Sequence, residues 1–534
     1  MGTTTFEISE SVDGAIHEPS ASSRQGKIRN QWLFGLGVGK RHWMTLLLCI
    51  GIFNIYTLRI CLSIAIVAMV EPTARPAATN SSSTNWTSSL NGTTEPPGTS
   101  PLRQDICPAP EGLNAVQAPA QTNSPRFAWD SQVQGTILGS YFYGYIAGQI
   151  PGGWLSRRFG GKLPFGLGIL IAGILTALSP VAATYHYGAL VALRIVEGLA
   201  TAVCYPAMHH LLARWSPSRE RTRMSSLVNC GSTIGNVIVF AVSGFIGDYL
   251  GWESIFYVYS GITGLWFVFF QLFVHNTPAE HPSITDAEMI LITGSTKRVR
   301  RGDARPMVSV PWRRILTALP VWAIFLSHFG HTWGTYTLQT NLPNYMRNIL
   351  NFQLSANGIF SALPYLAQWV FGLSSAYASD YLRHRNLMST TNVRKMFNTL
   401  ANVIPTAALI AVGYVDCDWA TAVTLLTIGN GFAGLTQSSF IVNGLDLSLV
   451  YASTIFSVSN TFANVPGIVS PYTVGLITAG PDGQTIANWR IIFYLSGGIR
   501  MFTAILYAIF ASGDVQPWNY PDGEGETVAV NQGK

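Results

Sequence analysis

Charged residues are scarce in this chain. Asp, Glu, Lys and Arg together make up 11% of the 534 residues, whereas hydrophobic residues make up 48%. Soluble globular proteins carry about 25% charged residues, so this composition argues against a soluble enzyme or a soluble binding domain. The mean hydropathy of +0.28 points the same way. The shortage of charge therefore indicates a polytopic membrane protein.

Several catalytic and motor motifs are also missing. The sequence contains no P-loop, no HExxH motif, no nucleophile elbow and no paired-cysteine motif. These absences argue against a fused ATP-driven motor and against an intramembrane enzyme. A channel would show a pore loop or a repeated selectivity filter, and the sequence shows neither. We therefore expect no enzymatic activity, no cofactor and no bound metal.

What the chain has instead is a series of apolar runs of about 20 residues, the length that crosses a bilayer. We expect an all-α membrane protein whose twelve transmembrane helices form two six-helix halves, 42–274 and 319–512, around a polar stretch at 275–318. The expected spans are 42–70, 131–151, 163–185, 187–213, 224–249, 254–274, 319–346, 355–378, 397–415, 419–442, 452–480 and 490–512.

Lysine and arginine are concentrated in the loops on one side of these spans. By the positive-inside rule, the tails 1–41 and 513–534 and the central loop 275–318 are cytoplasmic. The first 40 residues lack the apolar core of a cleavable signal peptide, so span one is expected to act as a signal anchor. The basic clusters are short and lie at membrane edges, which argues against nucleic-acid binding. We expect disordered tails and a functional monomer surrounded by membrane lipid.

The loop 71–130, between spans one and two, lies on the opposite side and is rich in Ser, Thr, Asn and Pro. It is expected to be disordered and glycosylated, since it contains three acceptor sequons, at Asn80, Asn85 and Asn91. The membrane is then either lysosomal or vesicular, or the plasma membrane. Of the six cysteines, which show no metal-binding spacing, only Cys107 and Cys417 fall on this side, and a disulfide between them stays open.

One arginine, Arg59, lies inside the first apolar run. A cation at bilayer depth costs about 2.5–3.5 kcal/mol on insertion scales and usually faces a water-filled cavity or a partner. The position therefore favours a binding site for an anion, with the neighbouring Tyr56 as a second candidate. The alternative is an arginine that reaches the membrane surface or pairs within the bundle.

Span four carries further polar residues near one helical face: Arg194, Glu197, Thr201, Tyr205 and His209. From its position, Arg194 lies about 10 Å from the non-cytoplasmic end of its helix, in the same half of the membrane as Arg59. Two arginines that converge on a cavity would bind a carboxylate or a phosphate. Glu197 would neutralise Arg194 in the empty site or take a proton; the alternative is an ion pair that only balances the helix.

Histidines are candidates for proton relays, because they titrate near physiological pH. His209 in span four and His331 in span seven are assigned this role, with ordinary packing as the alternative for each. Arg500, deep in span twelve, fits neither role, and structural pairing or an approach to the membrane surface is expected for it.

Duplicated six-helix halves with a basic loop after their second helix are typical of the major facilitator superfamily. Within it, the chain resembles the anion transporters of solute carrier family 17. The stretches that carry this resemblance are Phe127–Gly153, Arg194–Leu199, Tyr205–His209, Ser389–Lys395, Ser459–Pro471 and Phe510–Trp518.

The resemblance implies secondary active transport of an anion. Arg59 looks like the substrate arginine of the family, Arg194 like a second functional arginine, and Glu197 and His209 match a span-four glutamate and histidine. Several positions depart from the family pattern. Thr201 replaces a glutamate tied to coupling, His331 replaces an arginine of the glutamate carriers, Gly444 stands in place of a histidine, and Val450 replaces a basic residue.

We therefore predict an alternating-access symporter of organic or inorganic anions, proton-coupled and similar to the sialin branch of the family. The substrate-binding candidates are Arg59, Arg194, Tyr56 and Tyr205, and the coupling candidates are Glu197, His209 and His331. One alternative is a sodium-dependent cotransporter of phosphate or organic anions at the plasma membrane. Another is an anion sensor that uses a transporter fold without turnover.

Overall fold

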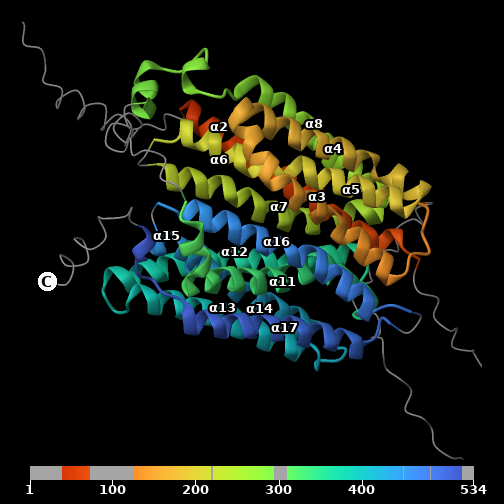
Figure 1. The fold of residues 1–534 in the computed structure, drawn as a ribbon. Helices are drawn as coiled ribbons and strands as arrows, with labels where there is room; N and C mark the ends of the chain where they lie inside the picture. Colours follow the sequence, from red (N-terminus) through yellow and green to blue (C-terminus); the bar gives the residue numbers. More distant parts are fainter. Residues whose placement is uncertain are drawn as a thin grey trace, which may run out of the picture.

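The computed structural model describes residues 39–71, 107, 124–217, 220–293, 310–448, 450–480 and 483–519. The three sequons at Asn80, Asn85 and Asn91 and most of both tails lie outside the described residues. The described chain forms two helical bundles that lie side by side (Figure 1).

The first bundle is built from the N-terminal half of the chain. Its helices are α2 (Lys40–Met69), α3 (Ser131–Phe159), α4 (Lys162–Tyr185), α5 (Tyr187–Ala202), α6 (Cys204–Trp215), α7 (Arg221–Leu250) and α8 (Trp252–Phe273), followed by the short η1 (Pro278–Glu280).

The second bundle is built from the C-terminal half. Its helices are α10 (Trp312–Thr317), α11 (Leu319–Asn348), α12 (Leu354–His384), α13 (Thr390–Val412), α14 (Trp419–Ala433), η2 (Gly434–Ser438), α15 (Phe440–Leu447), α16 (Ala452–Ile477), α17 (Ile486–Phe510) and η3 (Pro517–Asn519).

The predicted two-half helical fold is confirmed, although two predicted spans are broken helices. Span four is divided at Val203 into α5 and α6, three residues before Pro206, which has no N–H for the helical ladder. Span ten is divided into α14, η2 and α15, where Gly434 allows α12 to approach closely: a Cβ on Gly434 would lie 2.9 Å from the backbone nitrogen of Gly372.

Seven described helical segments are long and apolar enough to cross a membrane by length and composition alone. They are Lys40–Met69, Lys162–Tyr185, Tyr187–Trp215, Arg223–Leu250, Trp252–Phe273, Thr390–Val412 and Ile486–Phe510. The other predicted spans correspond to α3, α11, α12, α14 with α15, and α16. These helices are more polar because they place many Thr, Ser, Asn and Gln side chains in the protein interior, as α11 does over Thr337–Asn341.

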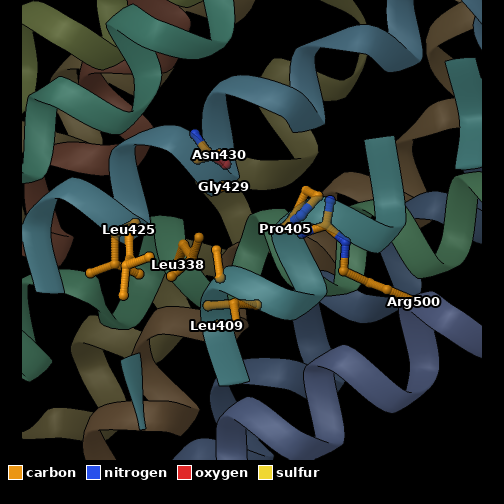
Figure 2. A pocket seen from close by; sticks show the side chains of 9 residues that line it. Leu338, Pro405, Leu409, Leu425, Gly429, Asn430 and Arg500 are labelled. Atoms are coloured by element: carbon orange, nitrogen blue, oxygen red, sulfur yellow. The ribbon is translucent and has the colours of Figure 1, made fainter. Parts of the chain in front are cut away.

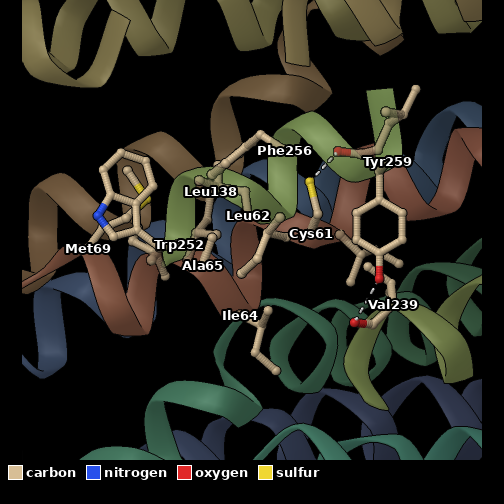
Figure 3. Close-up of a cluster of buried hydrophobic side chains, with 14 of the residues drawn as sticks. Cys61, Leu62, Ile64, Ala65, Met69, Leu138, Val239, Trp252, Phe256 and Tyr259 are labelled. Carbon is tan, nitrogen blue, oxygen red and sulfur yellow. Dashed lines mark hydrogen bonds between the residues drawn. The ribbon is translucent and has the colours of Figure 1, made fainter. Parts of the chain in front are cut away.

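We name the two ends of the bundles for the segments found there. At the loop end α2 ends at Met69 and α3 begins at Ser131, and at the terminal end α2 begins at Lys40 and α17 ends at Phe510. Near the loop end, the last turns of α2 pack against α7 and α8 in a close hydrophobic cluster (Figure 3). There the hydroxyl of Tyr259 bonds Ser243 at 3.0 Å. This packing fixes the position of α2 within its half.

The halves meet near the loop end and the middle of the bundles. Within the described ranges, four side-chain hydrogen bonds join the halves apart from the Cys107 segment, whose sulfur lies 3.7 Å from the carbonyl oxygen of Asp416, and none lies near the terminal end. The pairs are Gln134 with Asn344, Asn236 with Gln339, Asp248 with Ser355, and Ser131 with Gln484. The structure is therefore closed at the loop end.

A disulfide joins Cys107 to Cys417, the pairing that the sequence left open. The backbone N–H of Cys107 also donates to the carbonyl of Ile349 at 3.2 Å. The loop between α2 and α3 is thereby attached to the turn between α13 and α14 in the other half. The sequence signal, two cysteines on the same side of the membrane, was correct but too general to establish the pair.

We expect the disulfide to be visible by thiol counting. The chain has six cysteines, four of them free, so a maleimide should label four thiols in the unfolded, unreduced protein and all six after reduction. Cys107→Ser and Cys417→Ser should each release one new thiol and lower the melting temperature equally, because either removes the same cross-link. Labelling of all six thiols without reductant would contradict the pairing.

Candidate functional site

Arg59 lies between the two halves and is surrounded by aromatic rings. Its guanidinium carbon is 4.3 Å from the ring centre of Phe142, 5.2 Å from that of Tyr141 and 5.8 Å from that of Tyr56. A fourth ring, Tyr336 of α11, comes from the C-terminal half and lies at 5.0 Å. Aromatic faces attract cations by about 0.5–2 kcal/mol each, so the rings hold this charge without neutralising it.

No carboxylate compensates Arg59 in the described part of the chain, where it forms no ion pair. Its Nη2 atom is buried and has no hydrogen-bond partner there. A guanidinium carries five N–H donors arranged to match a carboxylate or a phosphate. The site therefore presents a cation with unused donors at the junction of the halves, which is the arrangement that an anion would complete.

Arg194 is placed differently from Arg59. Its Nη1 donates to Glu197 Oε2 at 2.8 Å, and its Nη2 donates to the backbone carbonyl of Arg59 at 2.7 Å. A longer bond of 3.4 Å reaches the carbonyl of Leu58. The side chain is only 2% exposed. Arg194 is thus occupied by a carboxylate and by the turn of α2 that carries Arg59, which favours a positioning role over direct anion binding.

The other span-four candidates support the aromatic side chains. Thr201 accepts or donates a 2.6 Å hydrogen bond with the hydroxyl of Tyr141, and Tyr205 donates to the hydroxyl of Tyr56 at 3.3 Å. Thr201 therefore has a structural partner, although it lacks the carboxylate that the family pattern has at this position. Tyr56 lies beside Arg59 and Tyr205 contacts Tyr56, and their substrate-binding roles stay predictions.

The two histidines lie apart from this cluster. His209 is exposed on α6, and no hydrogen bond joins it to Arg59 or Glu197. His331 is buried in the C-terminal half, where its ring lies 5.7 Å from that of Phe440 and its Nε2 lies 3.4 Å from Thr335 Oγ1. The structure brings neither of them to Glu197, and their relay roles stay predictions.

Sequence reasoning missed three of the rings and the residue that orients one of them. Tyr141, Phe142 and Tyr336 were not singled out as site residues, although Tyr141 and Phe142 lie within the family-like stretch Phe127–Gly153. The hydroxyl of Tyr336 donates to Asn464 Oδ1 at 3.1 Å. Asn464 lies in another such stretch, Ser459–Pro471, so the available signal was a match to the family and not a chemical pattern.

Arg500 is also buried, only 1% exposed, and does not reach the membrane surface. Its Nη2 lies 3.5 Å from the carbonyl oxygen of Ala401. Pro405, four residues later, has no N–H to bond that carbonyl, so Arg500 contacts a carbonyl that Pro405 leaves free within α13. It also lines a cavity of about 10 Å³ with Asn430 (Figure 2), a volume that suits about one water molecule. Arg500 packs against Gly334 of α11, and no described hydrogen bond joins it to Arg59, which favours a structural role.

The fold and this site together define a membrane transporter in which Arg59, a cation without a counter-charge among the described residues, lies between two helical halves. Residues 48–471 match the family profile described as "Major Facilitator Superfamily". The chain belongs to this superfamily and, within it, to solute carrier family 17.

Two relatives and one solved structure illustrate the similarity. Sialin of Homo sapiens is 37% identical over 485 residues, covering 91% of this chain and 92% of sialin. Vesicular glutamate transporter 2 of Homo sapiens is 36% identical over 402 residues, 75% of this chain and 68% of that protein. The crystal structure of a bacterial homologue of the human lysosomal transporter Spinster aligns with a TM-score of 0.62 at 13% identity, over 88% of this chain and 96% of that one. The predicted class, an integral membrane anion transporter and not an enzyme, is confirmed.

The contacts of Arg194 predict a specific stability pattern. Arg194→Met should lower the unfolding free energy by about 3–5 kcal/mol, because it leaves the Glu197 carboxylate buried without its partner. The double variant Arg194→Met/Glu197→Met should recover part of that loss, since no charge then remains unpaired. Arg59→Met should change stability least. Thermal unfolding of the purified protein would measure all three, and a double variant less stable than Arg194→Met would contradict the paired arrangement.

Proposed function

We propose that this protein is a proton-coupled, alternating-access symporter of organic monocarboxylates in a lysosomal or vesicular membrane. Arg59 binds the carboxylate, and the aromatic rings around it contact the body of the substrate. The observation that carries this proposal is the buried Nη2 atom of Arg59, which has no partner among the described residues and lies between the halves. In this fold, substrates bind near the midplane where the two halves meet.

The charge balance of the site favours a carboxylate over a phosphate. Arg194 is neutralised by Glu197, so Arg59 supplies one uncompensated positive charge. A monocarboxylate matches one such charge, whereas a doubly charged phosphate would leave one negative charge without a partner in a low-dielectric site. Four aromatic rings also suit an organic substrate, because they provide contact area for a carbon skeleton.

Polar groups on the opposite wall favour a substrate with hydroxyl or amide groups. Tyr336 and Asn464 lie on the C-terminal half, and Asn464 Nδ2 donates to the carbonyl of Asn460 at 2.6 Å. These groups add hydrogen-bonding capacity and no charge. A sugar acid would satisfy both walls, and sialin is among the relatives that match this chain over most of its length, as is a putative inorganic phosphate cotransporter of Drosophila melanogaster.

Glu197 is the residue that we assign to proton coupling. It is 1% exposed and bound to the same arginine that holds the turn of Arg59. Protonation would weaken its bond to Arg194 and change the support of that turn, which connects proton binding to the anion site. Because Thr201 replaces a glutamate that the family ties to coupling, Glu197 is the carboxylate left on this face of span four. The loss of that second carboxylate weakens the case for proton coupling, so sodium coupling at the plasma membrane is the competing proposal.

The decisive experiment is uptake into proteoliposomes of purified protein. Labelled sialic acid, glutamate and inorganic phosphate would each be tested under an imposed proton gradient and, separately, a sodium gradient. Proton-driven uptake of a carboxylate supports the proposal. Uptake of phosphate that requires sodium supports the competing cotransporter, and binding without counterflow supports a sensor.

Substitution of Arg59 should separate binding from folding. Arg59→Ala should abolish uptake while leaving the melting temperature nearly unchanged, because no described carboxylate depends on this side chain. Arg59→Lys should retain a charge but lose the paired N–H donors, so its KM should rise at least tenfold. Normal uptake by Arg59→Ala would remove Arg59 from the binding site.

Glu197→Gln should flatten the pH dependence of uptake, because a glutamine has the same shape and cannot take a proton. The matched comparison is Thr201→Val, which removes a polar group from the same helical face without changing a carboxylate. Uptake would be measured at several pH values on the side that supplies protons. An unchanged pH profile in Glu197→Gln would remove this residue from coupling.

A further inference from the structure

The start of α12 depends on a residue of the other half. The first N–H groups of a helix have no partner within the helix. Gln353, at the N-cap of α12, makes no side-chain capping bond, and the first turn contains no acidic residue. Instead, the backbone N–H of Ser355 donates to Asp248 Oδ2 at 2.8 Å. Asp248 lies in the last turn of α7, in the N-terminal half.

The backbones of α7 and α12 approach closely around this bond. A Cβ on Gly358 would lie 2.5 Å from the carbonyl oxygen of Phe240, and a Cβ on Gly244 would lie 3.0 Å from the Cα of Ser355. The rings of Phe240 and Tyr365 stack at 5.2 Å across the same contact. A second close contact between the halves joins α3 to α16.

The cap between Asp248 and Ser355 is the one hydrogen bond among the four between the halves that brings a carboxylate to a helix N-terminus. The other three join amide and hydroxyl side chains: Gln134 to Asn344, Gln339 to Asn236, and Gln484 to Ser131. A negative charge at a helix N-terminus is stabilised by the helix dipole and by charge-assisted hydrogen bonding. Within the described residues Asp248 forms no ion pair that would hold it in another position.

We infer that Asp248 is a positioning residue that sets the balance between the loop-end-closed and loop-end-open states of the transporter. Alternating access requires the halves to separate at the loop end. Asp248 and Ser355 belong to different halves, so their bond exists in the closed state and is lost on opening. Its free energy therefore acts on one state of the cycle and not on the anion site itself.

Hydrogen–deuterium exchange of the purified protein in nanodiscs, without substrate, tests this inference. Asp248→Ala should increase amide exchange by about fivefold or more in the first turn of α12, given the strength of a charge at a helix N-terminus. The same increase should appear at 467–475 of α16, on the second closing contact. Peptides of α13 near the terminal end should not change. Faster exchange in α12 alone would show a local cap and overturn the inference.

Two further variants guard against a folding defect. Asp248→Asn keeps the shape and an acceptor oxygen but removes the charge, so its effect should be intermediate. Ser355→Pro removes the N–H donor within the first helical turn, where proline is tolerated, and should add nothing to Asp248→Ala in the double variant. The control is Glu253→Gln, which removes another acid at the loop end, one that accepts from Ser124 at 2.7 Å and does not touch α12. Additive effects, or an equal effect of the control, would overturn the inference.

A transport measurement extends the test and rests on the proposed function. In oriented proteoliposomes, Asp248→Ala should lower the KM for anion presented at the loop end by about fivefold, because more molecules are open on that side. The KM at the terminal end should not fall. An equal change of KM on both sides would show an effect on the site and overturn the inference. The exchange experiment needs no substrate, so failure of the proposed function leaves it intact.

Discussion

The constraint on which this structure depends is the cost of a guanidinium in a medium that cannot solvate it. Arg59, Arg194 and Arg500 lie in the interior segments of their helices, and each has a different set of partners. Arg194 has a carboxylate at 2.8 Å, and Arg500 has a backbone carbonyl that Pro405 leaves free. Arg59 has aromatic rings and no described counter-charge. Because burial without compensation is expensive, Arg59 is the arginine for which we propose an anionic ligand.

The arrangement around Arg59 also explains why its neighbours are organised as they are. Arg194 donates to the carbonyl of Arg59 and forms an ion pair with Glu197, so this pair supports the backbone turn that carries Arg59. Tyr336 comes from the other half and is oriented by Asn464. Arg59 is therefore carried by the N-terminal half and covered by Tyr336 of the C-terminal half. An anion bound to Arg59, as proposed, would contact both halves. A change in Arg194 would affect the turn of α2 that carries Arg59, through the bond to its backbone carbonyl.

Arg59 could be singled out from the sequence because a charge within an apolar run is visible without a structure. The twelve-span fold followed from the lengths of the runs, and Arg59, Tyr56 and Tyr205 proved to be neighbours. The roles within the site were harder to predict. Whether Arg194 faces a ligand or a backbone carbonyl depends on the rotation of α5 about its axis by a few tens of degrees. The spacing of polar residues along the sequence does not determine that rotation. Tyr336 and Cys107 depend on contacts between distant segments, and Thr201 became understandable only when the Tyr141 hydroxyl was seen beside it.

The contact between the halves also contains few charged groups. Three of its four hydrogen bonds join amides or hydroxyls, which are exchanged for water at little net free energy, so the closed end is able to open. A full salt bridge there would favour the closed state too strongly. An entirely apolar contact would not fix the orientation of the two halves. A carboxylate on a helix N-terminus is intermediate, since its energy is about 0.3–2 kcal/mol. A bias of this size shifts a two-state population severalfold without locking the transporter in one state.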